Sequence, residues 1–341
     1  MRRAGRAVAL VAVAALAFVA ARTVTDAVAP WTTGDIVADK LAALAERDVG
    51  VVFIGSSRTY RGVDPTVFDR TAARLGAGFT SFNLAAPQMF AAEAEFVLEE
   101  ALADPPPGLR WVVLAPDLIS PEQNAPNSAN RRTVAWHDLA GTSEALQAVV
   151  HAGDSPLGDR LEWSYNHLDS FLINQTGRGR LLDLAVGRLD DGGDPEDPRS
   201  LGGDGDGFVS YDQSLEQGTV NRGERQTHEE FLAGEPIWTP PVIEPIGIHF
   251  DYVARVEGLA ADAGVGVIWL VAPGDVSSPW LQEAAARGLV THLVDFSDRA
   301  AHPDLYDRGL WWNRGHLNRD GARLFSRLLA EALVPIVTGG G

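Results

Sequence analysis

The sequence predicts an α/β protein with a three-layer α/β/α, flavodoxin-like architecture around a five-stranded parallel sheet. The first supporting observation is a set of short apolar runs rich in β-branched residues, of which Val51–Ile54 is the first. The second is that amphipathic segments of helical period separate these runs, as in βαβ units whose sheet is covered on both faces. In the middle of the chain, over about 118–250, this alternation stops. We therefore expect one α/β domain interrupted by a large, mostly helical insertion.

The chain begins with a targeting segment. Arg2, Arg3 and Arg6 precede an unbroken apolar run over 7–21. A basic start followed by such a run is typical of a secretory signal peptide or a signal anchor, although the run is short for a bilayer span. Because basic residues stay on the cytoplasmic side, we expect the chain from about residue 30 onward to be exported. Retention of the segment predicts a cell-membrane protein with a single N-terminal anchor, and cleavage predicts a periplasmic or extracellular protein.

Composition excludes several classes of function. The chain has 341 residues and a formal net charge of −18, so it offers no basic face for nucleic acid. It contains no cysteine, which excludes disulfides, cysteine nucleophiles and thiolate metal sites. The histidines show no metal-ligand spacing, and no metal or cofactor is expected.

The elements follow from apolar period and from start and stop signals. Asp64 and Pro65 suit the cap and first position of a helix, and the Asp104–Gly108 segment, with three prolines, ends the next one. The expected strands are 51–54, 79–85, 111–115, 265–271 and 291–296. The expected helices lie at 64–75, 90–102, 250–263, 279–287 and 319–333, with others at 142–152, 159–174 and 179–189 inside the insertion. Right-handed crossovers then favour the strand order 2-1-3-4-5.

The predicted organisation has five parts. They are a signal peptide or signal anchor (1–25), a tether with a leading helix (26–50), the first half of the α/β domain (51–117), the insertion or cap (118–250) and the second half of the domain (251–335). We expect the insertion to pack near the carboxyl edge of the sheet.

Polar and charged side chains follow the predicted strands at their carboxyl ends, where open α/β sheets bind ligands. They are Ser56, Ser57 and Arg58 after the first strand, Gln88 after the second, Asp117 after the third, and Asn313 and His316 before the last helix. A serine in such a turn becomes a nucleophile when a histidine arrives from elsewhere in the chain. The alternative is an ordinary solvated strand–loop junction.

At these residues the chain resembles a known family. The Gly55-Ser56-Ser57 turn, and a histidine just before the C-terminal helix, resemble the SGNH (GDSL-like) hydrolases. The resemblance is closest to the membrane-anchored branch with a Gly-Ser-Ser-Arg start and a His-Leu-Asn ending, which includes proteins allied to polysaccharide O-acetylation factors. It covers roughly 51–117 and 250–335. It implies that Ser57 is the nucleophile, that the backbone N–H of Ser57 is one oxyanion donor, and that His316 is the base.

Three supporting positions depart from the family pattern. The family usually has Asp three residues before the histidine, where this chain has Asn313. An Asn can orient the imidazole but offers no charge to stabilise imidazolium. Gln88 stands nearest to the family's oxyanion Gly, and Asp117 stands where an Asn donor is usual, so an anion replaces a hydrogen-bond donor.

Two functions of different classes follow. The first is a serine esterase or O-acyltransferase acting on an acyl ester, with a cell-envelope glycan as one candidate substrate. The second is a catalytically weak or inactive protein that binds a glycan or a protein partner in envelope assembly, and for either a membrane-bound partner is allowed. Retention of Ser57 and His316 favours the first function, and the three departures favour the second.

Other residues leave alternatives open. Arg58 suits an anionic substrate group, or an ion pair with Asp64. Trp311 and Trp312 suit a sugar-stacking wall or a packed core. The Asp- and Gly-rich stretch 190–212 does not match a calcium loop, and we expect an exposed acidic loop there.

Overall fold

The fold was analysed in a computed structural model, which describes residues 13, 17–25, 27–28, 35–116, 119–177, 198–239, 245–275 and 278–339. The chain divides into two compact units. One comprises residues 1–38 and 121–193, and the other comprises residues 39–120 and 194–341. The second unit contains the sheet and every described candidate site residue.

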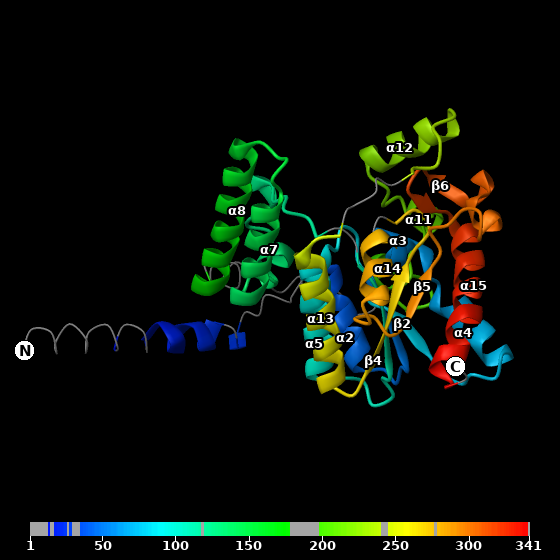
Figure 1. Ribbon diagram of the computed structural model, residues 1–341, viewed down its shortest axis with the longest axis horizontal. Coiled ribbons are helices and arrows are strands. Elements are labelled where there is room, and N and C mark those ends of the chain that lie inside the picture. Colours follow the sequence, from blue (N-terminus) through cyan, green and yellow to red (C-terminus); the bar gives the residue numbers. More distant parts are fainter. Residues whose placement is uncertain are drawn as a thin grey trace, which may run out of the picture. The chain divides into compact units, whose positions relative to one another are not determined.

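The sheet confirms the predicted fold class and strand order. Five parallel strands lie in the order β2-β1-β3-β4-β5 (Figure 1). They are β1 (Val51–Gly55), β2 (Ser81–Asn83), β3 (Trp111–Ala115), β4 (Gly266–Val271) and β5 (Leu293–Asp295). Val51 pairs with Ser81 on one side and with Trp111 on the other, so β1 is central. The carboxyl ends of β1, β2 and β3 therefore lie at one edge, as ligand sites of such sheets require.

Helices flank the sheet, as expected for a parallel sheet buried on both faces (Figure 1). On one face α4 (Pro65–Arg74) and α15 (Arg319–Val337) pack together, and Phe68 and Phe325 enter a core that contains Phe53 of β1. On the other face α5 (Ala91–Ala103) contacts β1, and α13 (Gly247–Asp262) contacts β4. The remaining helices of this frame are α2 (Ile36–Ala45), α3 (Ser57–Gly62) and α14 (Ser278–Ala286).

Capping residues position two of these helices, and the first of these caps was predicted. Asp64 caps α4 by accepting a hydrogen bond from Val67 N, and Pro65 occupies the first helical position. Asn318 caps α15 in the same way through Gly321 N. The cap at Asn318 fixes the start of α15 at Arg319, three residues after His316.

The middle of the chain is helical, as predicted, and contributes to both units. In the first unit it forms η1 (Ala125–Asn127), α6 (Arg131–Ala135), α7 (Leu139–His151) and α8 (Leu157–Thr176). In the second unit it forms α10 (Pro198–Leu201), α11 (Tyr211–Glu216) and α12 (Arg222–Leu232). The helix predicted over 179–189 lies outside the described residues.

Part of the stretch expected to be an exposed acidic loop is buried. Lys40, fully buried, donates from Nζ to the carbonyl oxygens of Asn83, Ala85 and Gly207 at 2.6–2.8 Å. Gly207 has φ of +86°, and a Cβ there would lie 2.0 Å from Asn83 O, so only glycine fits. The prediction of an exposed loop was wrong here, because the acidic composition gave no sign of the backbone contact with the end of β2.

In the part of the chain that is described, none of the helices combines the length and hydropathy needed to cross a membrane. Most of the predicted targeting segment lies outside the described residues.

Candidate active site

Ser57 lies where β1 passes directly into a short helix. Gly55 ends the strand, Ser56 is the N-cap residue of α3, and Ser57 is the first helical residue. A Cβ at Gly55 would lie 2.6 Å from Thr59 Oγ1 and 2.8 Å from Ala115 O, so the turn requires glycine. Ser56 is buried, whereas Ser57 is partly exposed. Of the two serines, Ser57 is the one that a substrate can reach.

His316 reaches Ser57 from a hairpin just before α15. The hairpin consists of β6 (Trp311–Asn313) and β7 (His316–Leu317), which pair antiparallel. His316 Nε2 lies 2.8 Å from Ser57 Oγ, within hydrogen-bond distance across 259 residues of sequence. The structure thus brings together the two residues that the sequence placed at the same edge.

Asn313 fixes the tautomer of His316. Its Oδ1 lies 3.0 Å from His316 Nδ1 and also accepts a hydrogen bond from Gly315 N at 3.0 Å. Because a backbone N–H can only donate, the atom that it faces is the oxygen of the amide. His316 Nδ1 must then carry the proton, which leaves Nε2 as an acceptor for the hydroxyl of Ser57. The turn from Asn313 to His316 forms without a positive φ at Gly315.

The imidazole of His316 is a weak base in this environment. Burial, followed by the nearby positive charges of Arg58 and Arg61, lowers the pKa of His316 to about 3. The amide of Asn313 supplies no opposing negative charge. The imidazole is therefore neutral at pH 7, as a general base must be, but gains little on accepting a proton.

The other predicted site residues, Arg58, Gln88 and Asp117, do not belong to this hydrogen-bonded chain as far as the structure describes them. Arg58 directly follows Ser57, and its guanidinium lies over the ring of Trp238, 5.3 Å from the centroid. Asp64, its alternative partner, caps α4. Gln88 is exposed in the segment after β2 and is the one described non-glycine residue with positive φ, at 56°. Asp117 lies outside the described residues.

The sequence did not predict that residues of the stretch 198–239 pack around this triad. Buried Arg61 of α3 donates from Nη1 to Val209 O, Ser210 O and Ser214 Oγ. Its guanidinium also lies 4.3 Å from the ring centroid of Tyr211, and Tyr211 in turn contacts the ring of His316 edge-on at 5.3 Å. No motif marked this stretch, and the only sequence signal was its position after strand three.

Helix α12 contacts strand β6 of the hairpin. Asn313 Nδ2 donates to Thr227 Oγ1 at 3.5 Å, and Thr227 Oγ1 donates to Glu224 O at 2.9 Å. His228 stacks on Trp312 and donates from Nδ1 to Trp312 O at 2.6 Å. A run of hydrogen bonds therefore extends from α12 through Asn313 and His316 to Ser57.

The paired tryptophans are packing residues. Trp311 and Trp312 are both buried, and Trp312 lies stacked between Tyr211 and His228. Trp311 Nε1 donates to Leu305 O at 2.9 Å. Of the two alternatives, the packed core is what the structure shows.

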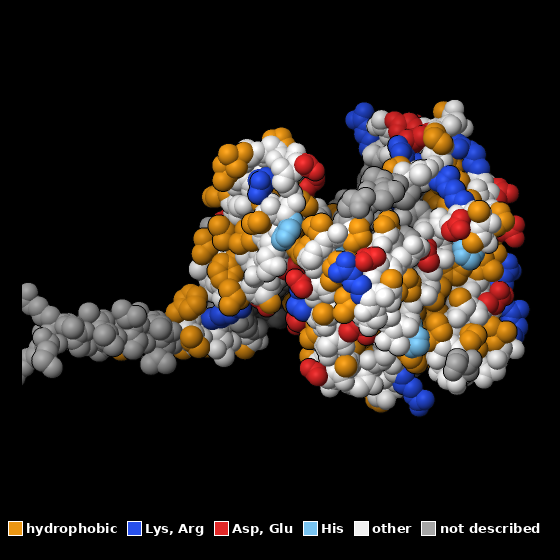
Figure 2. All heavy atoms as spheres, viewed as in Figure 1, with side chains coloured by type: hydrophobic (Ala, Val, Ile, Leu, Met, Phe, Trp, Pro, Cys, Tyr) orange, Lys and Arg blue, Asp and Glu red, His pale blue; other side chains and the backbone are white. Residues whose placement is uncertain are grey.

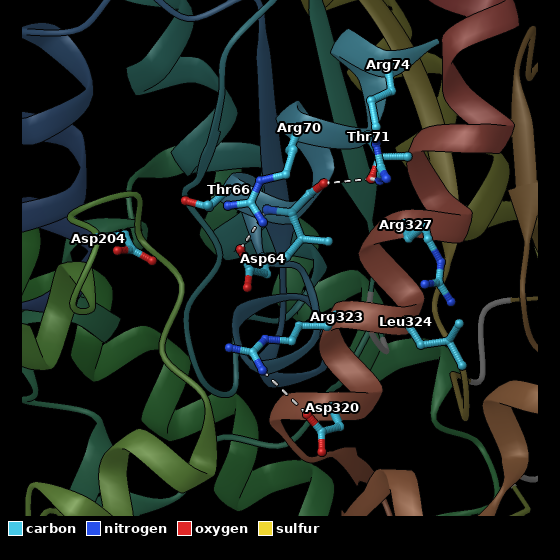
Figure 3. Close-up of a pocket in the computed structure, with 11 residues that line it drawn as sticks. Asp64, Thr66, Arg70, Thr71, Arg74, Asp204, Asp320, Arg323, Leu324 and Arg327 are labelled. Atoms are coloured by element: carbon cyan, nitrogen blue, oxygen red, sulfur yellow. Dashed lines mark hydrogen bonds and ion pairs between the residues drawn. The ribbon is translucent and has the colours of Figure 1, made fainter.

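A separate hollow of about 510 Å³ lies between α4 and α15, and Ser57, Asn313 and His316 do not line it. Figure 3 shows Arg70 and Arg74 approaching it from α4, and Arg323 and Arg327 from α15. The carboxylates of Asp64, Asp204 and Asp320 also line it. Since acids and arginines nearly balance and most are exposed, we treat it as a solvated surface groove.

Comparisons with known proteins assign no family to the chain. No protein-family model matches the chain. No curated protein sequence matches it significantly. Within the described ranges, no three His, Cys, Asp or Glu side chains come together in a way that could hold a metal ion.

Proposed function

We propose that the protein is a serine-dependent ester hydrolase or O-acyltransferase of the SGNH type. The observation that supports this is the hydrogen-bonded chain from Ser57 Oγ through His316 to Asn313 Oδ1, at the carboxyl edge of a parallel sheet. The order of the parts, serine after the first strand and histidine before the last helix, is that of the resemblance. An acyl ester, with an envelope glycan as candidate, is the proposed substrate.

The geometry supports a two-step reaction. Ser57 Oγ attacks the ester carbonyl while its proton passes to His316 Nε2. The imidazolium then protonates the departing alcohol, which leaves the acyl group on Ser57. A water or an acceptor hydroxyl, deprotonated by His316, releases the acyl group as acid or as a new ester. Asn313 Oδ1 holds the Nδ1–H throughout, so that Nε2 remains the atom that exchanges protons.

One observation favours a second candidate function. The pKa of His316, lowered to about 3, and the neutral amide beside it provide little stabilisation for imidazolium. A protein that binds a glycan or a partner in the envelope, with weak or no turnover, has the same frame. The site would then recognise an acyl group without transferring it.

Labelling with a fluorophosphonate ester probe separates the two candidates. The full chain should be labelled, Ser57→Ala should not, and both should be compared for hydrolysis of small acetyl esters. Ser56→Ala is the matched control, because Ser56 is adjacent and makes no side-chain cap hydrogen bond. Equal labelling of the parent and Ser57→Ala would refute the assignment of Ser57. Absence of both labelling and turnover in the parent would leave the binding function.

The proposal also places the chain beyond the cytoplasmic membrane. Its support is the basic start and the apolar run over 7–21. A C-terminal fusion to a reporter that is active only in the cytoplasm should remain inactive. An active reporter would refute export.

A further inference from the structure

Helix α8 buries mostly polar side chains and exposes a row of apolar ones. The side chains that it buries within its unit are Asn166, His167, Ser170, Ile173 and Asn174. Five large apolar side chains, 45–69% exposed, cover its other side, and they are Leu157, Leu161, Tyr165, Leu168 and Leu172. We call these five the α8 stripe. Surface helices of proteins surrounded by water have the opposite arrangement.

The α8 stripe is narrow and continuous. Its members are spaced four, four, three and four residues apart, which at 100° per residue places them within an arc of about 80°. Figure 2 shows apolar side chains gathered over this helix. A contiguous exposed patch of this kind marks a contact surface rather than scattered surface leucines.

The buried polar face shows that α8 is correctly oriented. Asn166 Nδ2 donates to Gln123 O at 2.6 Å, Ser170 Oγ donates to Ser128 O at 2.8 Å, and Asn174 Nδ2 donates to Val134 O at 2.8 Å. Turning the helix to bury the leucines would break these hydrogen bonds. The stripe must therefore be covered by something outside this unit's own core.

The C-terminal end of α8 contacts the residue that follows the N-terminal apolar run. Residues 17–25 are helical, and Phe18 and Val19 on this helix are exposed. Arg22, which directly follows the run, donates from Nη1 to Asn174 O and from Nη2 to Asn174 Oδ1, both at 3.2 Å. Asn174 lies only two residues beyond Leu172. A bilayer that holds the apolar run must therefore have its surface close to the end of α8.

We propose that the α8 stripe lies in the interfacial layer of the membrane in which the N-terminal segment is anchored. This rests on the proposed export and on retention of the N-terminal segment as an anchor. Interfacial helices bury their apolar face about 5–10 Å into the boundary between headgroups and acyl chains, and Tyr165 suits that layer. Exposed Glu162 lies beside the stripe, so the contact is apolar and does not require anionic lipid.

Fluorescent labels on single cysteines test this in the full chain, which has no native cysteine. An environment-sensitive label is placed on the stripe in Leu161→Cys, Tyr165→Cys and Leu168→Cys, and the chain is reconstituted in phosphatidylcholine vesicles. We expect the labels at these positions to emit at shorter wavelength than in water. Nitroxide-labelled lipid should quench this emission. Glu162→Cys is the matched control, one residue from Leu161 and outside the stripe, and its label should be quenched by aqueous iodide instead. Val19→Cys reports insertion of the anchor.

Each other outcome has a definite meaning. If lipid quenches the label at Val19 but the stripe labels behave like that at Glu162, the inference fails while the anchor and the esterase proposal stand. If lipid does not quench the label at Val19, both anchoring and this inference fail. If the stripe labels are shielded from iodide without being quenched by lipid, protein covers the stripe and the inference is refuted. Rapid oxidative cross-linking of Tyr165→Cys chains would then identify a second copy as the cover.

Discussion

At the residue scale, Asn313 determines how much the site can do. It orients His316 through Oδ1, but among the described residues the charges that shift the pKa of the imidazole are two positive ones, Arg58 and Arg61. An imidazole whose pKa is about 3 is always available to accept a proton near pH 7 and gives the proton up at once. Orientation and basicity are thus separated here, and they can be tested separately.

Replacing Asn313 by Asp should restore basicity without loss of orientation. A carboxylate 3.0 Å from His316 Nδ1 stabilises imidazolium and raises the pKa of His316. We expect esterase turnover to rise by about tenfold or more. The parent's kcat/KM should be flat with pH above about 4, whereas the variant should lose activity as pH falls through about 5–7. The measurement is a pH–rate profile of both proteins, and identical profiles would contradict the role assigned to Asn313.

Thr227 is a positioning residue for the same amide. Its hydroxyl is the described acceptor for Asn313 Nδ2, and losing it leaves a buried donor unpaired, at a cost of about 1–3 kcal/mol. Thr227→Val should lower kcat by about tenfold with little change in KM, because Thr227 acts on the orientation of His316 through Asn313 and not on substrate binding. Thr227→Ser should retain activity. Gln226→Ala, adjacent and exposed on α12, is the control.

A loss of activity in Thr227→Ser equal to that in Thr227→Val would show that packing, not the hydroxyl, is what matters. In an Asn313→Asp background the Thr227 hydroxyl faces an oxygen. The hydroxyl can rotate to donate to this oxygen, and it then loses its hydrogen bond to Glu224 O. The cost of removing the hydroxyl should consequently remain.

The sequence could predict the triad but not its surroundings. Ser57 and His316 stand next to elements with strong apolar period, so their edge of the sheet followed from topology. Asn313 followed from its three-residue spacing to His316. Arg61 and Thr227 carry no such signal, because they act through carbonyl oxygens and an amide that become neighbours only after folding.

At the element scale, the segment between α10 and α11 is held against the sheet by backbone contacts. Asp206 O accepts a hydrogen bond from Asn83 N at 2.9 Å, and Asp206 Oδ2 accepts from Thr66 N and Thr66 Oγ1. Such contacts do not depend on apolar period, which explains why the sequence predicted an exposed loop. The second strand also differs from its prediction. It was predicted over 79–85, but β2 has only three residues and ends at Asn83, whose backbone N–H bonds to Asp206 O.

The carboxyl of Asp206 should make this contact sensitive to pH. Burial raises the pKa of Asp206 to about 6, above its value in the unfolded chain. The folded state therefore binds the proton more tightly, and the stabilisation is complete below about pH 4 and lost as pH rises through 6. A shift of about two pKa units corresponds to roughly 2–3 kcal/mol of unfolding free energy.

The measurement is denaturant unfolding of Asp206→Asn and of the parent between pH 4 and 7. Asp206→Asn should be destabilised less by rising pH than the parent across this window. The exposed Asp104→Asn is the control and should follow the parent, because Asp104 is not among the groups that shift the pKa of Asp206. Asp69 has a pKa raised to about 6 as well, so part of the slope should remain in Asp206→Asn. Superimposable pH dependences of Asp206→Asn and the parent would refute the assignment to Asp206.

At the scale of the whole molecule, the two units are interleaved in sequence and each is compact. The apolar period marks the second unit well, because a parallel sheet needs continuous buried runs. It marks the first unit poorly, because α8 buries polar residues and exposes apolar ones. The sequence could thus predict helices in the middle of the chain, but not which of them share a core.

Separate cores predict separate unfolding transitions in the intact chain. Phe325 of α15 is fully buried beside Phe296 in the second unit, and Ile173 of α8 is buried in the first. Phe325→Leu and Ile173→Val change packing with little loss of volume, so each should cost about 1 kcal/mol and leave the fold intact. A cost of that size lowers the midpoint of a domain by several degrees. Calorimetry of the full chain should show two transitions, with Phe325→Leu lowering one and Ile173→Val the other. Fluorophosphonate labelling of Ser57 should be lost on heating together with the transition that Phe325→Leu moves. A single transition lowered by both substitutions would mean that the two units unfold as one.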